Sequence, residues 1–315
     1  MAIEPIRAIL DVDTGLDDAM AIAMAVHAPS VQLLGITTVA GNVGLKYTTQ
    51  NTLRVLAFLG ATVPVYRGMS RPLDRPAMDA AWVHGEDGLG GAQLPPATQQ
   101  PEAISAPQFL IDAARQSPGE LTFIFVGPLT NLAMAVALEP ELPRLVQRLV
   151  IMGGAFQVPG NDTPVAEFNI AADPQAAAQV LAAGFNATWV GLDVTTQTVL
   201  TRDQYDALAN AQSPPARLVR MVARYAFEER GVEAFQLHDP LAVGVAMDPT
   251  LVNAPEEAMA IEIALGFTAG QTVIERRKRP SDWTHTRVAR TVERERFVAL
   301  FAATLGLPHV PSPST

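Results

Sequence analysis

The sequence contains no cysteine, which excludes disulfide bonds and metal sites built from thiolates. Charged residues make up only 17% of its 315 residues and hydrophobic residues 49%, so the chain can bury a large core and is not typical of a disordered protein. Positive charge is scarce, and the net charge is −10. Nucleic acid and anionic membranes are therefore expected to be poor partners.

No apolar run is long enough to predict a membrane span. The most apolar stretch, residues 121–138, contains Gly127, Pro128 and Asn131 and is typical of a strand, a turn and a helix. The first ten residues, MAIEPIRAIL, include an acid and a proline and have no secretory-signal core. We therefore expect a cytoplasmic protein without a membrane partner, and the missing cysteine suits that compartment.

Apolar segments of strand and helix character alternate along the chain, which predicts an α/β fold with a mainly parallel central sheet flanked by helices, as in Rossmann-like open sheets. Three late β-rich segments (258–265, 271–277 and 284–290) predict an antiparallel edge, and long irregular stretches follow positions 66 and 152. We expect one domain over residues 1–315. Strands are predicted at 6–12, 31–39, 63–66, 121–126, 149–152 and 187–194, and helices at 45–59, 103–116, 173–183, 202–211, 216–229, 238–247 and 293–305.

The segment AILDVDTGLDD places four acids at the end of the first predicted strand: Asp11, Asp13, Asp17 and Asp18. Asp17 and Asp18 fit a helix first turn, where negative charge suits the helix dipole. Asp11 and Asp13 have no such explanation, because crowded buried carboxylates repel one another and lose solvation. The pattern favours a hard-metal or acid–base site over a purely structural cluster.

Further polar residues follow the other predicted strands, and strand carboxyl ends are where open α/β sheets bind ligands. His238-Asp239-Pro240 begins a predicted helix, where Asp239 acts either as a cap or as another metal ligand. Together with the Asp cluster these residues predict a polar pocket. The other members of this set are Asn42, Thr130, Asn161, Glu167 and Asn169.

Six motifs in this order resemble the inosine–uridine-preferring nucleoside hydrolase family: DVDTGLDDAMAI, VAGN, HGEDGLGG, GPLTNLA, NDTPVAEFN and HDPLAV. The resemblance runs from about residue 6 to about residue 290. It implies hydrolysis of the N-glycosidic bond of ribonucleosides to ribose and free base. It also implies a bound Ca²⁺, a small-molecule ribonucleoside as the partner, and a homodimer or homotetramer.

By position, the resemblance implies metal binding by Asp13, Asp18 and Asp239, with the backbone carbonyl of Thr130. Asp13 also matches the general base, which would activate a metal-held water. His238 resembles the leaving-group acid and His84 a histidine near the base, while Asp11 has a supporting role. The ribose hydroxyls are expected to bind Asp17, Asn42, Asn161, Glu167 and Asn169.

Base recognition is not assigned to single residues. The family draws part of its base pocket from the region before HDP, here residues 216–235, while Trp82 and Trp283 are stacking candidates by residue type only. Two other functions stay open. The DVDTG segment also resembles haloacid-dehalogenase-like Mg²⁺ phosphatases, in which Asp11 would be the nucleophile. A non-catalytic nucleoside- or ribose-binding protein is the second alternative.

Overall fold

A computed structural model describes residues 4–277 and 281–308, so the first three and last seven residues of the predicted domain lie outside it. The strands of its main sheet are β1 (Ile6–Val12), β2 (Val31–Thr38), β3 (Val65–Arg67), β4 (Leu121–Phe125), β5 (Val146–Met152), β6 (Ala187–Val190), β10 (Glu256–Ile261), β11 (Thr272–Ile274) and β12 (Thr284–Val288). They lie in the order β11-β10-β12-β6-β5-β4-β1-β2-β3. Two small antiparallel pairs join β7 (Val199–Thr201) to β8 (Ala234–Gln236) and β9 (Val252–Asn253) to β13 (Thr291–Val292).

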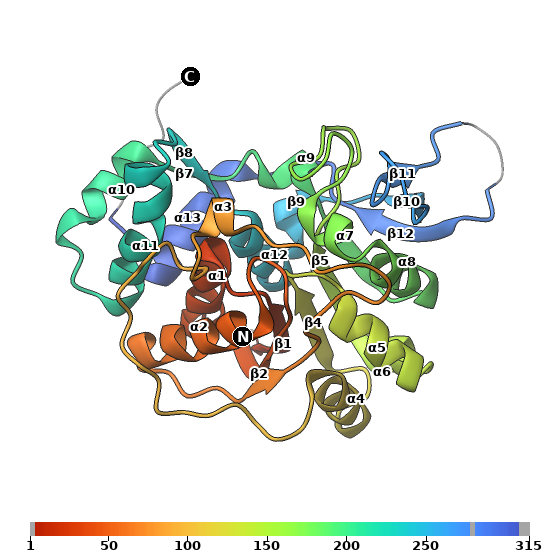
Figure 1. The fold of residues 1–315 in the computed structure, drawn as a ribbon, viewed down its shortest axis with the longest axis horizontal. Coiled ribbons are helices and arrows are strands. Elements are labelled where there is room, and N and C mark those ends of the chain that lie inside the picture. Colours follow the sequence, from red (N-terminus) through yellow and green to blue (C-terminus); the bar gives the residue numbers. More distant parts are fainter. Residues whose placement is uncertain (1–3, 278–280, 309–315) are drawn as a thin grey trace.

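The predicted sheet is confirmed. Strands β1 to β6 and β12 pair in parallel, while β10 runs antiparallel to both β11 and β12 and forms the expected antiparallel edge. This edge extends as an arm from the rest of the molecule (Figure 1).

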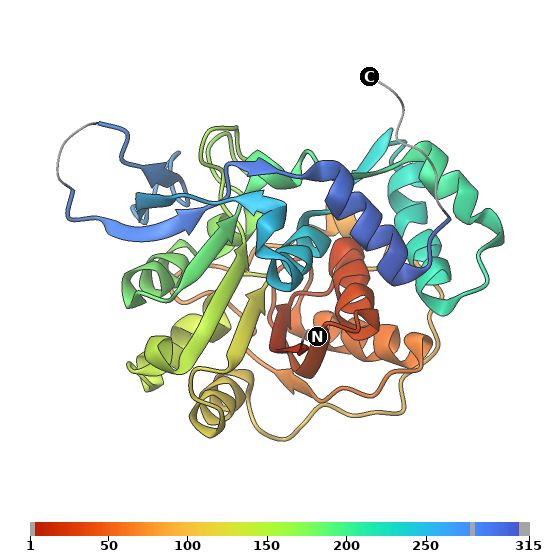
Figure 2. The same cartoon turned by 180° about the vertical axis from the view of Figure 1, so that it is seen from behind.

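Helices cover both faces of the sheet (Figures 1 and 2). Alternation along β1 explains the two layers: Ala8, Leu10 and Val12 join one apolar core and Ile9 joins the other. The first core contains side chains of α1 (Leu16–His27), α2 (Leu45–Leu59), α11 (Pro214–Arg224), α12 (His238–Met247) and α13 (Arg294–Leu305). The second contains those of α4 (Ala106–Gln116), α5 (Thr130–Leu138), α6 (Leu142–Leu145) and α8 (Pro174–Ala183).

Short helical segments occupy the connections, and within the described ranges no helix combines the length and apolarity that crossing a bilayer requires. They are α3 (Ala81–His84), α7 (Phe168–Ala172), α9 (Leu192–Thr195), α10 (Arg202–Ala207), the 3₁₀ turns η1 (Leu208–Asn210) and η3 (Pro249–Leu251), and a π-helix, η2 (Tyr225–Glu229).

Several predicted ends shift by a few residues, and two of these differences bear on the site. The strand expected at 187–194 stops at Val190, because the chain turns at Gly191 into α9 and Asp193 there accepts hydrogen bonds from the amides of Phe156 and Gln157. The helix expected at 216–229 starts at Pro214 and changes from α to π geometry at Tyr225. Inserted π turns are frequent at functional sites.

The site lies where the sheet order reverses. β1 is flanked by β2 and β4; the chain continues through β3 on one side and through β5 and β6 on the other. Connections leaving β1 and β4 therefore diverge, and the carboxyl ends of these two strands open a crevice.

Candidate active site

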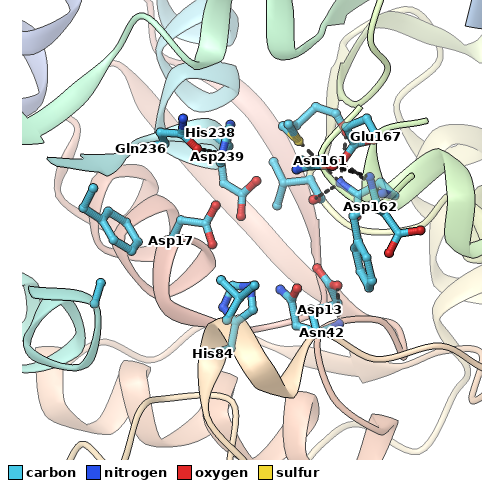
Figure 3. A pocket seen from close by; sticks show the side chains of 18 of the residues that line it. Asp13, Asp17, Asn42, His84, Asn161, Asp162, Glu167, Gln236, His238 and Asp239 are labelled. Atoms are coloured by element: carbon cyan, nitrogen blue, oxygen red, sulfur yellow. Dashed lines mark hydrogen bonds between the residues drawn. The ribbon is translucent and has the colours of Figure 1, made fainter. Parts of the chain in front are cut away.

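A cavity of about 350 Å³ lies at this crevice. Its walls come from the turn after β1, the two long loops predicted from the sequence, and the segment leading into α12 (Figure 3). The structure brings nine of the eleven predicted site residues to its lining; Asp18 lies directly behind the lining, and Thr130 lies elsewhere. The nine are Asp13, Asp17, Asn42, His84, Asn161, Glu167, Asn169, His238 and Asp239.

Asp18 organises the turn between β1 and α1. Its carboxylate accepts hydrogen bonds from the main-chain amides of Gly15 (2.8 Å) and Asp13 (3.1 Å), and from the side-chain amide of Asn42 (3.0 Å). These donors offset part of the rise in the pKa of Asp18 that burial causes. The turn therefore holds one acid firmly while presenting its neighbours to the cavity.

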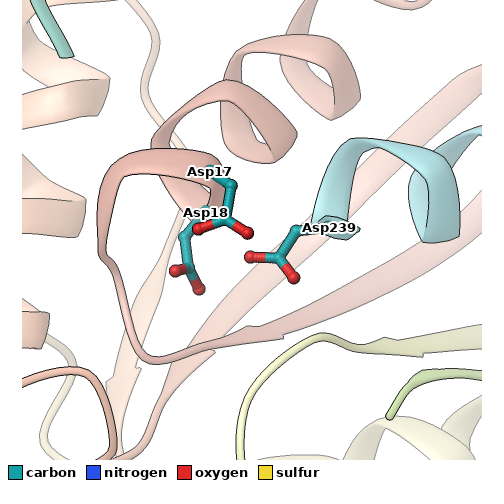
Figure 4. A group of neighbouring side chains, drawn as sticks. All are labelled: Asp17, Asp18 and Asp239. Carbon is teal, nitrogen blue, oxygen red and sulfur yellow. The ribbon is translucent and has the colours of Figure 1, made fainter. Parts of the chain in front are cut away.

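Three buried carboxylates meet at this turn. One oxygen from each of Asp17, Asp18 and Asp239 lies within 4.8 Å of the others, with Asp239 reaching in from the start of α12 (Figure 4). Burial raises the pKa of Asp17 to about 8 and that of Asp239 well above its usual range, and neighbouring negative charges add to both shifts. Such a cluster is stable when it holds protons or a cation.

Asp13 lies beside this cluster, with its Oδ2 accepting the Asn42 main-chain amide at 2.7 Å. Burial and the negative charge of Asp18 raise its pKa well above the usual range. Two glycines permit the backbone to approach its carboxylate: a Cβ at Gly41 would lie 2.1 Å from Asp13 Oδ2, and one at Gly127 would lie 2.9 Å from Oδ1.

The loop after β5 supplies the opposite wall. Glu167 caps α7 and accepts amides from Gly154, Asn169 and Ile170; burial raises its pKa to about 7. The side-chain amide of Asn169 donates to the carbonyl oxygen of Val126 at 2.8 Å. Asn161 accepts the Phe168 amide through its side-chain oxygen. These bonds fix each polar side chain relative to the ends of β4 and β5.

Two histidines complete the cavity. His84, on α3, accepts the Leu16 amide through Nδ1 at 3.0 Å, and burial lowers its pKa to about 3. Nδ1 of His238 lies 2.7 Å from the Thr195 hydroxyl and Nε2 lies 3.0 Å from the Gln236 side-chain oxygen. Burial lowers the pKa of His238 to about 4. Both rings are therefore neutral at pH 7.

Thr130 is placed differently from its neighbours in the motif. Its hydroxyl donates to Asp173 at 2.7 Å, and the residue of this turn that lines the cavity is Val126, at the end of β4. Sequence reasoning missed Val126 because an apolar side chain at a strand end gives no signal of a site residue.

Asp11 lies behind the cavity. It is fully buried, and its Oδ2 accepts hydrogen bonds from the Thr37 hydroxyl (2.5 Å) and the Asn131 side-chain amide (2.7 Å). Asn131 in turn accepts the Met69 amide at the start of the first long loop. Asp11 thus holds β1, β2, α5 and that loop together. A carboxylate in this position is not available as the nucleophile that a phosphatase of the haloacid-dehalogenase type requires.

The sequence model of the inosine–uridine-preferring nucleoside hydrolases matches residues 8–299. The chain belongs to this family. It is 37% identical to a pyrimidine-specific ribonucleoside hydrolase RihB of Escherichia coli, over 93% of this chain and 95% of that protein. It is 38% identical to a probable uridine nucleosidase 2 of Arabidopsis thaliana, with the same shares covered. The purine-preferring ribonucleoside hydrolase of Gardnerella vaginalis has a similar structure, with a TM-score of 0.89 and 33% identity over 95% of this chain and 98% of that one.

Membership agrees with the geometry described above. The hydrolase is an enzyme of nucleoside catabolism in a metal-dependent family, and its described residues include the buried acidic cluster that suits a metal ion. Two of these relatives are named for pyrimidine nucleosides and one for purine nucleosides, so membership alone leaves the choice of base to the residues of this chain.

Proposed function

We propose that this enzyme hydrolyses the N-glycosidic bond of ribonucleosides in the cavity at the β1–β4 crevice, with Ca²⁺ as its cofactor. The meeting of Asp17, Asp18 and Asp239 beside Asp13 carries the proposal. Its donor set contains only oxygen, which suits a hard divalent cation, and Ca²⁺ accepts six to eight oxygen ligands in flexible geometry.

Asp18 and Asp239 would hold the ion, together with Asp13 and with a main-chain carbonyl of the turn after β4. We assign that last position to Val126 in place of Thr130, because Val126 lines the cavity. When bound, the ion would supply Lewis acidity that lowers the pKa of a water and would neutralise the crowded carboxylates.

Asp13 is the proposed general base. Its position on the cavity beside the acidic cluster suits a carboxylate that takes a proton from the attacking water. Direct attack by that water predicts inversion at C1′. The ribose is held by hydroxyl contacts, and the nearby carboxylates stabilise the positive charge that develops on the sugar. The proposed ribose ligands are Asp17, Asn42, Asn161, Glu167 and Asn169.

His238 is the proposed acid for the departing base. The Thr195 hydroxyl and the Gln236 oxygen orient its ring so that Nε2 carries the proton, because a carbonyl oxygen can only accept. His84 is fixed in the same tautomer by the Leu16 amide, which also leaves a proton on Nε2. Each neutral imidazole can therefore donate a hydrogen bond through Nε2 to the departing base, which stabilises the negative charge that develops on it.

The test is release of reducing sugar from inosine, uridine, cytidine and adenosine by the purified protein, with and without a calcium chelator. We expect ribose from at least one substrate, loss of activity with chelator, and recovery on adding Ca²⁺. Activity unchanged by exhaustive chelation would refute the metal, and phosphate release from a phosphomonoester without ribose release would refute the reaction.

We also propose that the hydrolase acts in the cytoplasm as one domain in a homodimer or homotetramer. The family resemblance and the missing cysteine support this assignment. Light scattering on the purified protein tests the assembly, and a monomer at micromolar concentration would refute it.

A further inference from the structure

The cavity has an apolar wall as well as its acidic one. The apolar wall combines Trp82 and Val83 from α3 with Ala226 from the π-helix η2 and with Val232 and Phe235 beyond it. If the sugar lies against the carboxylates, as the proposed function states, the planar base lies against this apolar wall. Trp82 is 66% exposed, so part of its side chain remains open to contact with an aromatic ring.

Arg230 is the one lysine or arginine among the residues that line the cavity. Five carboxylates also line it, yet none within the described parts of the chain forms an ion pair with Arg230. Its guanidinium instead lies 5.4 Å from the centre of the Trp82 ring. Burial lowers the pKa of His84, and the nearby positive charge of Arg230 adds to that shift.

Two neighbouring arginines of the same segment do form ion pairs, unlike Arg230. Arg220 pairs with Glu228, and Arg224 pairs with Glu229. The π-helix is also fixed against the first long loop, because Gly90 packs so closely on Tyr225 that a Cβ there would lie 2.3 Å from the Tyr225 Cβ. The guanidinium of Arg230 thus lies over the ring of Trp82, although the two residues come from segments far apart in the sequence.

We propose that Arg230 and Trp82 form the base-recognition pair of this enzyme, and that Arg230 determines specificity. Trp82 offers a stacking face, and the planar guanidinium donates to an exocyclic carbonyl oxygen of the base. Arginine binds the O6 and N7 acceptors of a 6-oxopurine with two hydrogen bonds, whereas the 6-amino group of adenine presents a donor that repels it. The pair therefore discriminates between bases by their carbonyl oxygens.

The test compares kcat/KM for inosine, adenosine and p-nitrophenyl β-D-riboside in the wild type and in Arg230→Gln. Losing a charged donor should lower the value for inosine roughly 10- to 100-fold. The inosine-to-adenosine ratio should fall at least about tenfold. Hydrolysis of the nitrophenyl riboside, whose leaving group has no carbonyl oxygen for Arg230 to bind, should stay within about threefold. Arg230→Lys should keep only part of the inosine activity, because lysine lacks the planar fork.

Arg217→Gln is the matched control, because Arg217 lies over the Phe58 ring at 5.4 Å but is outside the cavity. An unchanged inosine-to-adenosine ratio in Arg230→Gln, or equal losses on all three substrates, would overturn the proposal.

A binding measurement separates this proposal from the proposed function. Hypoxanthine should quench the fluorescence of Trp82, with the signal assigned by Trp82→Phe, and Arg230→Gln should weaken binding about tenfold or more. A wild type that binds hypoxanthine in this way but releases no ribose would refute the hydrolysis and support the pair. Equal hypoxanthine affinity in wild type and Arg230→Gln would refute the pair.

Discussion

Without a bound cation, the folded enzyme should lose stability as the pH rises above 6.5. Burial raises the pKa values of Asp11 and Glu167 to about 7, whereas carboxylates in an unfolded chain titrate near pH 4. At pH 7 each is about half protonated in the folded state and ionised in the unfolded state. The folded protein therefore holds about one more proton, and the free energy of unfolding falls by about 1.4 kcal/mol per pH unit from these two groups.

The direction of this effect follows from the raised pKa values. An acid whose pKa is higher in the folded state gives its full stability below the unfolded pKa and loses it as the pH rises through the folded pKa. Asp13, Asp17 and Asp239 add to the loss, because their pKa values are also raised. His84 and His238 act in the opposite direction, because their pKa values are lowered and unfolded imidazoles titrate near pH 6.5. At pH 7 they offset about half a proton of the loss, and above about pH 7.5 they contribute little.

The assay is thermal unfolding between pH 6.5 and 8.0 in chelator, repeated with excess Ca²⁺. We expect the Tm of the chelated protein to fall by roughly 2–4 °C per pH unit. Excess Ca²⁺ should reduce this dependence, because the ion would favour the ionised forms of the acids that hold it, whereas Asp11 and Glu167 would keep their share of the slope. Glu167→Gln should remove about half of the slope assigned to the two groups. A Tm that is constant or rises with pH in chelator would refute the reasoning.

Asp248→Asn is the control for this experiment. Its hydrogen bond from the Thr250 hydroxyl lowers the pKa of Asp248, so this carboxylate is ionised in both states throughout the window. The variant should leave the slope unchanged.

Three further predictions concern turnover. Asp13→Asn should lower kcat by about 10²- to 10⁴-fold, as expected for loss of a general base, and near-native rates would exclude that role. Gly41→Ala should lower activity sharply because its Cβ would lie 2.1 Å from Asp13 Oδ2, whereas Gly44→Ala, with no atom within 4 Å, should not; steady-state kinetics on both variants distinguish this contact from a general loss of loop freedom. His238→Ala should slow nucleosides with poor leaving groups more than p-nitrophenyl β-D-riboside, and equal slowing of both would remove His238 as the acid.

Most of the fold was predictable because its signals are local. The predicted bounds of α2 and α12 agree with the structure, since each helix combines a clear apolar pattern with a distinct start and end. The strand expected to reach residue 194 shows the limit of this reasoning. The apolar pattern continues past Val190, but Asp193 is needed to hold the loop after β5, and that demand comes from residues almost forty positions away.

Some residues of the candidate site could be predicted from the sequence and others could not. Acids and amides at strand ends were predictable, because parallel strands bring their carboxyl ends to one edge. Val126 was not, because its proposed contribution is a main-chain group, and Arg230 was not, because only the fold shows that it has no acidic partner among the described residues and lies over Trp82. Residue type identifies polar chemistry, whereas the base-binding end depends on which side chains remain unpaired after folding.

Asp11 and Asp18 explain how one short segment can carry so many buried acids. The carboxylate of Asp18 accepts hydrogen bonds from two main-chain amides and the Asn42 side chain. One oxygen of Asp11 accepts hydrogen bonds from Thr37 and Asn131. Hydrogen bonds of this kind favour the ionised form and offset desolvation. Burial still raises the pKa of all five acids, and neighbouring negative charges add to the shifts of Asp13, Asp17 and Asp239. Hydrogen bonds of Asp11 and Asp18 therefore fix this segment, and the crowding of Asp18 with Asp17 and Asp239 makes it suitable for a cation.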